Sequence, residues 1–324
     1  MPPIEVAQHP WWFWVTFNLF VLCMLALDLG VFHRKSHTVK YKEALAWTGV
    51  WMSLAFLFAG FIYWYEPSRA AAHQRSGEFI ACYLIEQSLS VDNIFIFLLL
   101  FRYFKVSPEH QHRVLFYGIL GAIVMRGILI FAGVALIHKF SWLNYFFGAL
   151  LLYTGIKMAR GGEPDVHPEH NPILRIFRRF VPITKDYHDH NFFFHSGGKL
   201  MATPLFAVLI LVETTDLLFA ADSIPAILAI SNDSFILYTS NIFAVMGLRS
   251  LFFAVSGLMG LFHYLSYGLA LILSFVGVKM VLDQGIGSFH LHVPILVSLG
   301  VIVGVLGLSI AASLMFPHQE KQES

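Results

Sequence analysis

Long runs of apolar residues constrain this chain of 324 residues more than any other feature. An α-helix needs about 20 residues to cross the hydrocarbon core of a bilayer, and many of the runs approach or exceed that length. Only 13% of the residues are charged, about half the share in a typical soluble domain. The sequence therefore predicts an all-α polytopic membrane protein with about nine transmembrane helices. The expected helices are Trp11–Phe32, Ala44–Tyr65, Phe79–Leu100, Val114–Ile137, Trp142–Met158, Met201–Ile230, Phe235–Val255, Leu261–Leu282 and Val293–Phe316.

Basic residues predict the orientation of these helices. Most of the 21 lysine and arginine residues fall in connections on one side of the expected bundle. Because cytoplasmic loops are enriched in Lys and Arg, the N-terminus is expected outside and the C-terminus in the cytoplasm. The formal net charge of +1 gives no indication of nucleic-acid binding. Cys23 and Cys82 each lie within an apolar run and are expected to be small core residues without a disulfide.

The one long connection, residues 161–200, is expected on the cytoplasmic side. It is rich in Pro, His and Arg and contains the run His188-Asp189-His190. Such a run could deliver metal ions to a membrane path. The simpler interpretation, a solvated surface loop, is favoured.

Two apolar stretches repeat one pattern of acidic residues. Glu86 is followed after five residues by Asp92-Asn93-Ile94, and Asp216 is followed after five residues by Asp222-Ser223-Ile224. Internal repeats of this kind indicate duplicated structural units. We therefore expect the two stretches to occupy equivalent places in the fold.

Further features follow in the same order in both halves. Arg126 and Arg249 each lie in the next apolar run, and Gly155-Ile156-Lys157-Met158 is then matched by Gly277-Val278-Lys279-Met280. The repeated unit thus holds three helices, and an odd number makes the second copy enter the membrane from the opposite face. This predicts a 3+3 inverted repeat of helices 3–5 and 6–8, with a substrate site near the midplane where the copies meet.

The repeat also predicts how the chain is divided. Two N-terminal helices and a cytoplasmic loop precede the first copy, and a last helix with a cytoplasmic tail follows the second. The expected boundaries are 1–78 for the N-terminal part, 79–160 for repeat 1, 161–200 for the cytoplasmic loop, 201–283 for repeat 2 and 284–324 for the C-terminal part.

Five carboxylates lie within expected spans: Glu86, Asp92, Glu213, Asp216 and Asp222. Each acid at the centre of a membrane helix costs about 2.5–3.5 kcal/mol on the insertion scale, so a functional role is expected. The structural alternative is that each acid forms a buried salt bridge with Arg126 or Arg249. Two arginines do not neutralise five acids, which leaves carboxylates for a cation or for protons.

The chemistry of these side chains indicates which cations they suit. Carboxylate, amide and hydroxyl oxygens are hard ligands, which suit Mg²⁺, Ca²⁺ and Mn²⁺ better than Zn²⁺ or Cu⁺. Residue types do not separate Mn²⁺ from Ca²⁺. Pro225 removes a backbone hydrogen bond beside Asp222, so we expect the helix to kink or unwind there and expose carbonyl groups. The candidate ion ligands are Glu86, Asp92, Asn93, Glu213, Asp216, Asp222 and Ser223, supported by Arg126, Arg249 and Asn241.

The acidic motifs resemble those of the TerC/Alx family of membrane proteins, in particular its Alx-type manganese exporters. The resemblance rests on Glu86 with Ser88-Leu89-Ser90-Val91-Asp92-Asn93, on Glu213-Thr214-Thr215-Asp216 with Ala221-Asp222-Ser223-Ile224-Pro225, and on Tyr238-Thr239-Ser240-Asn241 followed by Gly247-Leu248-Arg249-Ser250. It implies export of Mn²⁺ across the bacterial inner membrane, in connection with alkaline pH and metal stress. It also implies that Glu86, Asp92, Glu213, Asp216 and Asp222 lie on the ion path.

Mn²⁺ is thus expected as the transported ion rather than as a prosthetic group, with the lipid bilayer as the surroundings and protons as candidate coupling ions. Two other functions stay open. Some TerC-like proteins are associated with a non-transport role in membrane insertion or stress, and Asp92 with Asp222 could form an intramembrane aspartyl protease pair. The Gly-x-Gly-Asp signature of such proteases is absent from the sequence, so no enzymatic activity is expected.

Overall fold

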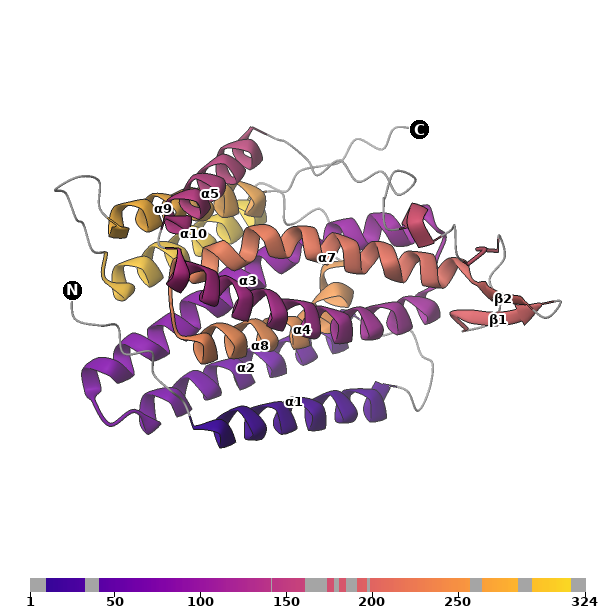
Figure 1. Cartoon of the computed structure of the whole chain (residues 1–324), viewed down its shortest axis with the longest axis horizontal. Helices are drawn as coiled ribbons and strands as arrows, with labels where there is room; N and C mark the ends of the chain where they lie inside the picture. The colour runs from indigo at the N-terminus through magenta and orange to yellow at the C-terminus, as the bar shows by residue number, and fades with distance from the viewer. Residues whose placement is uncertain are drawn as a thin grey trace.

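The computed structural model describes residues 10–32, 41–140, 142–160, 174–177, 181–184, 191–196, 199–256, 264–284 and 293–315. Within these ranges, each expected span coincides with a helix (Figure 1). The helices are α1 (Trp11–Phe32), α2 (Tyr41–Tyr65), α3 (Arg69–Tyr103), α4 (Pro108–Lys139), α5 (Leu143–Ala159), α7 (Pro204–Leu228), α8 (Ser234–Ser256), α9 (Leu265–Gln284) and α10 (Ile295–Met315).

Among the described helices, six are long and apolar enough to cross a membrane by length and composition: α2, α3, α4, α7, α8 and α10. An all-α membrane protein is therefore confirmed, whereas the count of nine spans stays a prediction. Large apolar side chains cover the outside of the bundle, where Leu57 is 70% exposed and Leu308 is 73% exposed. Such a surface suits contact with lipid, because every backbone polar group is already satisfied within a helix.

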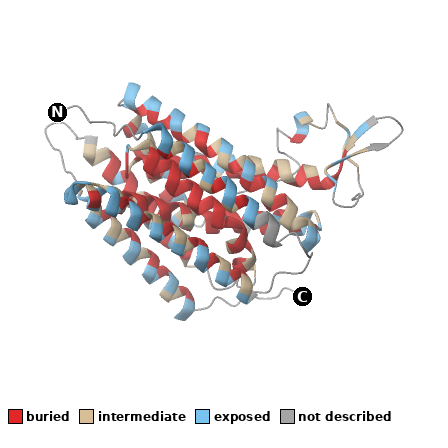
Figure 2. Ribbon diagram, turned by 90° about the horizontal axis from the view of Figure 1, so that it is seen from below, coloured by how far each residue is buried: buried red, intermediate tan, exposed pale blue. Residues whose placement is uncertain are grey.

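Helix α8 forms the centre of the bundle. In its apolar stretch 94% of the residues are buried, against 17% in that of α10. Helix α8 packs against α2, α3 and α4. Figure 2 shows the buried residues gathered in the middle of the bundle, with exposed residues on the outer helices. Aromatic rings attach the N-terminal helices to this centre, since Phe58 of α2 lies 5.6 Å from Phe17 of α1 and 5.1 Å from Phe243 of α8 between ring centroids. Tilted ring pairs at this spacing contribute more than their buried area alone.

Helices that occupy equivalent places in the two sequence repeats pack against each other: α3 with α7, α4 with α8, and α5 with α9. The first of these pairs runs antiparallel. Ser231, just after α7, contacts Glu78, whereas Ile227, four residues earlier, contacts Cys82, four residues later.

The pair α5 and α9 is also antiparallel and meets through glycines. A Cβ at Gly277 would lie 2.8 Å from the carbonyl oxygen of Gly148, and a Cβ at Gly155 would lie 2.8 Å from the carbonyl oxygen of Ala270. Only residues without a side chain allow two helix backbones to approach this closely. Gly155 and Gly277 are the matched glycines of the sequence repeat, so the duplicated motif lies at the contact between its own two copies.

Several helix boundaries differ from the prediction. Helix α3 begins at Arg69, not Phe79, and α4 begins at Pro108, where Ser107 and a proline in the first turn favour a helix start. Hydropathy detects only the part of a helix that matches the bilayer core, so polar extensions beyond it escape detection. Helix α7 begins at Pro204 rather than Met201, because Lys199–Ala202 form a β-strand.

The expected break at Pro225 is not seen. Helix α7 continues through Pro225 to Leu228. Pro225 cannot donate to the carbonyl of Ala221, but the helix continues past it, and the backbone N–H of Ala229 donates to the carbonyl of Pro225 at 3.0 Å. The prediction that the helix unwinds beside Asp222 is therefore wrong, whereas a kink there stays a prediction.

The connection between the halves contains a β-hairpin that was not predicted. Strands β1 (Phe193–Ser196) and β2 (Lys199–Ala202) pair antiparallel and project from one end of the bundle (Figure 1). Phe192 and Phe193 both pack on Phe206 in the first turn of α7, which attaches the hairpin to the membrane helices. The candidate metal-delivering run His188-Asp189-His190 lies outside the described residues.

Candidate ion site between the repeats

Arg126 of α4 lies at the centre of a buried ionic cluster. Only 1% of its surface is exposed. Its Nε donates to Oδ2 of Asp216 on α7 over 3.0 Å, and its Nη2 donates to Oδ1 of the same carboxylate over 2.8 Å. Two parallel bonds from a guanidinium to one carboxylate are the strongest form of ion pair available to protein side chains.

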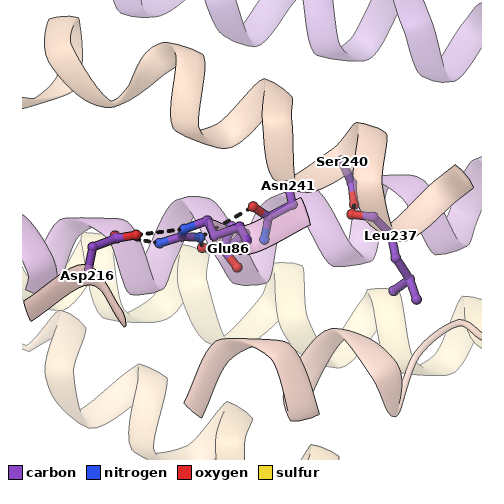
Figure 3. A network of polar contacts seen from close by, with 6 residues as sticks. Glu86, Asp216, Leu237, Ser240 and Asn241 are labelled. Carbon is purple, nitrogen blue, oxygen red and sulfur yellow. Dashed lines mark hydrogen bonds and ion pairs between the residues drawn. The ribbon is translucent and has the colours of Figure 1, made fainter. Parts of the chain in front are cut away.

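The same guanidinium also contacts two other helices. Its Nη1 forms an ion pair with Oε1 of Glu86 on α3 and approaches Oδ1 of Asn241 on α8 at 3.5 Å. Figure 3 shows Asp216, Glu86 and Asn241 of this cluster, with the polar contacts between the residues drawn as dashed lines. Glu86, Asp216 and Asn241 are 1%, 3% and 0% exposed. One cation thus connects α3, α4, α7 and α8, two helices from each repeat.

The cluster contains more polar groups than the arginine satisfies. Oε2 of Glu86 and Nδ2 of Asn241 are buried and have no hydrogen-bond partner among the described residues. Two carboxylates also face one guanidinium, which leaves a formal negative charge. A buried polar atom without a partner costs about 1–3 kcal/mol, so these atoms call for water or a bound ion.

Glu213 is a third carboxylate, after Glu86 and Asp216. It lies on α7, one turn before Asp216. It lies against Gly121 of α4, where even a Cβ would overlap the carboxylate. Its Oε2 is buried and has no partner in the described part of the chain. Gly121 therefore provides the space that this carboxylate occupies between α4 and α7.

Hydroxyl groups extend the polar surface along α3 and α7. Ser90 and Asn93 lie one and two turns after Glu86 on the same face of α3 and are 1% and 2% exposed. Ser223 of α7 is 2% exposed. Neither Ser90 Oγ nor Ser223 Oγ has a partner among the described residues. Both helices therefore carry buried hydroxyl oxygens that the described residues leave unsatisfied.

The remaining candidates take different places. Asp222 accepts a hydrogen bond from Oγ1 of Thr154 on α5 at 3.2 Å, so it joins α7 to α5 rather than to the Arg126 cluster. Arg249 of α8 is buried. Asp92 lies on α3, but its side chain is outside the described set. The salt-bridge alternative thus holds for Glu86 and Asp216.

Among the described residues, no three His, Cys, Asp or Glu side chains are grouped closely enough to hold a metal ion. The arginine lies between the acids instead, so the predicted ligands do not form a ready-made metal shell.

A second buried polar cluster was not anticipated. Glu78 of α3 accepts hydrogen bonds from Ser231 at 2.6 Å and from Gln74 at 2.9 Å, and Lys279 of α9 donates to the carbonyl of Ala229 at 3.1 Å. Glu78 stands one residue before the expected span, so hydropathy gave no signal for it. Gly121 likewise carried no chemical signal, because its role comes only from its neighbour across the helix contact.

Comparison with known proteins places the chain. Residues 71–321 match the family described as Integral membrane protein TerC family. The chain belongs to the TerC family. The match begins in the first turn of α3, so both repeats and the whole Arg126 cluster lie within the TerC region, whereas α1 and α2 precede it.

Full-length relatives in bacteria support this membership. A Myxococcus xanthus membrane protein, STKORF319, is 48% identical over 303 residues, which cover 93% of this chain and 92% of the relative. Proteins of Salmonella typhi and Escherichia coli K12 are 44% and 45% identical over at least 95% of both chains. Both carry the name of a proposed membrane-bound redox modulator, Alx. No solved structure matches this TerC-family chain.

Proposed function

We propose that this TerC-family protein is a bacterial inner-membrane transporter that exports divalent cations, with Mn²⁺ as the preferred substrate. One observation carries the proposal. Glu86, Asp216 and Glu213 bring three buried or half-buried carboxylates to the membrane interior, where the described contacts pair Glu86 and Asp216 with one cation, Arg126, and the Oε2 atoms of Glu86 and Glu213 have no partner in the described part of the chain. Such uncompensated acids in membrane helices are typical of ion and proton paths.

The arrangement of the helices supports transport. The contacts of α3 with α7, α4 with α8, and α5 with α9 are those expected of a 3+3 inverted repeat, and two of the pairs run antiparallel. In transporters of this architecture, the substrate binds where the two copies meet. Arg126 lies at that place, because its partners come from both copies.

The donor set supports the choice of ion. Carboxylate oxygens of Glu86, Glu213 and Asp216, the amide of Asn241 and the hydroxyls of Ser90 and Ser223 are all hard oxygen ligands, which favour Mn²⁺ or Ca²⁺ over Zn²⁺ and Cu⁺. Mn²⁺ is placed first because of the family resemblance. Asp92 and Asp222 would extend the path along α3 and α7. Export is inferred from the family resemblance, and the basic loops favour an N-terminus outside and a C-terminus in the cytoplasm.

The relatives named Alx are described in terms of redox modulation, and the thiols bear on that role. This chain has two cysteines. Both are free, Cys23 on the exposed surface of α1 and Cys82 buried on α3, so Cys23 is not the core residue that was expected. With no pair of thiols in contact, disulfide exchange within the chain does not explain a redox effect. An altered supply of a metal ion would explain one indirectly.

The test is flux of divalent ions in proteoliposomes that contain the purified protein. Wild-type protein should move Mn²⁺ but neither Zn²⁺ nor Cu⁺. Glu213→Gln should abolish the flux and leave thermal stability unchanged, because Glu213 loses no ion pair with any of the described residues. The matched control is Glu66→Gln, which breaks a partly exposed pair with Arg75 (2.5 Å) at the end of α2 and should transport normally.

Two results would contradict the proposal. Wild-type proteoliposomes without flux of any divalent ion would favour the non-transport role in membrane insertion or stress. Full Mn²⁺ flux by Glu213→Gln would remove Glu213 from the path.

A further inference from the structure

The geometry of Arg126 raises a question that the proposed function leaves open. A guanidinium keeps its charge at every physiological pH, and this one is 1% exposed between two carboxylates. It lies where a transported cation would contact Glu86 and Asp216. A permanent cation and a divalent metal ion cannot share the same two carboxylates, because like charges at contact distance repel strongly at low dielectric.

We propose that Arg126 is a tethered counter-ion that occupies the carboxylates of Glu86 and Asp216 whenever no metal ion is bound, and that allows the empty transporter to return. The inference rests on the proposed transport function and deepens it. The metal ion and the guanidinium alternate on one pair of carboxylates, and each releases the other.

The unsatisfied atoms distinguish this role from a structural salt bridge. A structural bridge would be expected to use all the donors and acceptors around it. Here Oε2 of Glu86 and Nδ2 of Asn241 are buried without partners among the described residues. Oε2 of Glu86 is thus a ligand atom that the guanidinium does not use, as expected of a carboxylate that also binds a metal ion, whereas Nδ2 of Asn241 is a hydrogen-bond donor.

The balance of charge gives the reason for such a device. Without any cation, Glu86 and Asp216 would place two negative charges in a site of low dielectric. The empty transporter would then reorient slowly between the two faces of the membrane, because this charge would have to move with the site. Arg126 cancels one of these charges in the empty state, and Mn²⁺ cancels both in the loaded state. The orphaned carboxylate of Glu213, one turn from Asp216, offers a neighbouring anion for the displaced guanidinium.

The proposal separates two kinds of transport. Exchange of Mn²⁺ for Mn²⁺ requires only the loaded transporter to reorient, whereas net efflux also requires the empty transporter to return. In Arg126→Gln, net efflux should fall by at least about tenfold, equivalent to about 1.4 kcal/mol on the barrier, while exchange continues. The apparent affinity for Mn²⁺ should rise by at least about tenfold, because the metal ion no longer displaces a competitor.

The experiment uses the full chain in proteoliposomes. Exchange is followed as uptake of radioactive Mn²⁺ into vesicles loaded with unlabelled Mn²⁺, and net flux as uptake into empty vesicles. Arg75→Gln is the matched control, since it removes an arginine from an ion pair with Glu66 outside the cluster, and it should leave both fluxes as in the wild type. Thermal unfolding with and without Mn²⁺ is measured on the same preparations.

Bound Mn²⁺ should also restore the thermal stability that Arg126→Gln loses with the guanidinium. It should raise the melting temperature of Arg126→Gln by at least about 4 °C more than that of the wild type. A variant that stays unfolded when purified with Mn²⁺ would overturn the inference, because the metal ion should then restore the balance of charge.

The other outcomes are equally decisive. Unchanged net efflux by Arg126→Gln would overturn the counter-ion role of Arg126 and indicate that protons neutralise the empty site. Loss of exchange together with net efflux in a folded variant would make Arg126 a structural residue. If wild-type protein shows neither flux, the proposed function itself fails, and the inference fails with it.

Discussion

Gly277→Ala is expected to destabilise the contact between the two repeats. Its Cβ would lie 2.8 Å from the carbonyl oxygen of Gly148, 3.0 Å from the amide nitrogen of Leu152 and 3.1 Å from Cβ of Leu151. Carbon contacts are favourable at about 3.5–4.0 Å, so α5 and α9 must separate by several tenths of an ångström. The nearest atoms belong to the backbone and cannot rotate away.

The magnitude follows from two opposing effects. Overpacking of this kind costs about 1–3 kcal/mol, whereas Ala gains up to about 1 kcal/mol over Gly in a helix. Gly304→Ala on α10 is the matched control, because nothing among the described residues lies within 4 Å of its Cβ position. Gly304→Ala should gain helix stability without any cost of overpacking. The two variants should therefore differ by about 1–3 kcal/mol in the free energy of unfolding.

The assay is thermal unfolding of the purified variants in one detergent. At about 2–4 °C per kcal/mol, Gly277→Ala should melt roughly 3–10 °C below Gly304→Ala. Gly155→Ala meets the carbonyl of Ala270 in the same contact, so one separation relieves both substitutions and the double variant should lose less stability than the sum of the single variants. Equal melting temperatures for Gly277→Ala and Gly304→Ala would refute the close packing of α5 on α9.

Two further substitutions test the polar groups. Gly121→Ala should displace the Glu213 carboxylate, whose flexible end can move away cheaply, so Mn²⁺ flux in proteoliposomes should fall roughly tenfold or more. The melting temperature should match that of Gly300→Ala, which meets nothing within 4 Å in the described structure. Flux equal to that of Gly300→Ala would exclude this role. Ser231→Ala removes the donor to buried Glu78 and should lower the free energy of unfolding by about 1–3 kcal/mol, whereas the exposed Ser53→Ala should change it by less than about 0.5 kcal/mol. Thermal unfolding of both serine variants tests this prediction. Similar losses of unfolding free energy in the two variants would count against a stabilising Glu78–Ser231 bond.

The positions of the helices were predictable because a bilayer sets the length of an apolar run. The repeated sequence motifs indicated which helices are equivalent before their contacts were known, whereas the inverted repeat itself stays a prediction. It did not give the partner of each charge. Spacing placed Arg126 and five acids within the spans, but the choice of Glu86 and Asp216 depends on the rotation and neighbours of four helices.

The features that were missed have physical reasons. The polar turns from Arg69 to Glu78 continue α3 beyond the apolar core, where hydropathy has no signal. Strands β1 and β2 are four residues each and follow a connection rich in polar residues, so no long periodic pattern marks them. The effect of Pro225 was overestimated because a membrane helix can lose one backbone hydrogen bond at a proline and still continue past it.

The assignment of one arginine to acids on α3 and α7 also has a consequence for biosynthesis. Glu86 and Arg126 belong to consecutive helices, so α3 and α4 can enter the bilayer as a hairpin in which Arg126 compensates the charge of Glu86. Helix α7 carries Glu213, Asp216 and Asp222 and no basic residue, and each such acid costs about 2.5–3.5 kcal/mol at the centre of a bilayer. Its insertion therefore benefits from a first repeat that is already in place, and the order in which the ribosome delivers the two halves becomes part of how the protein assembles.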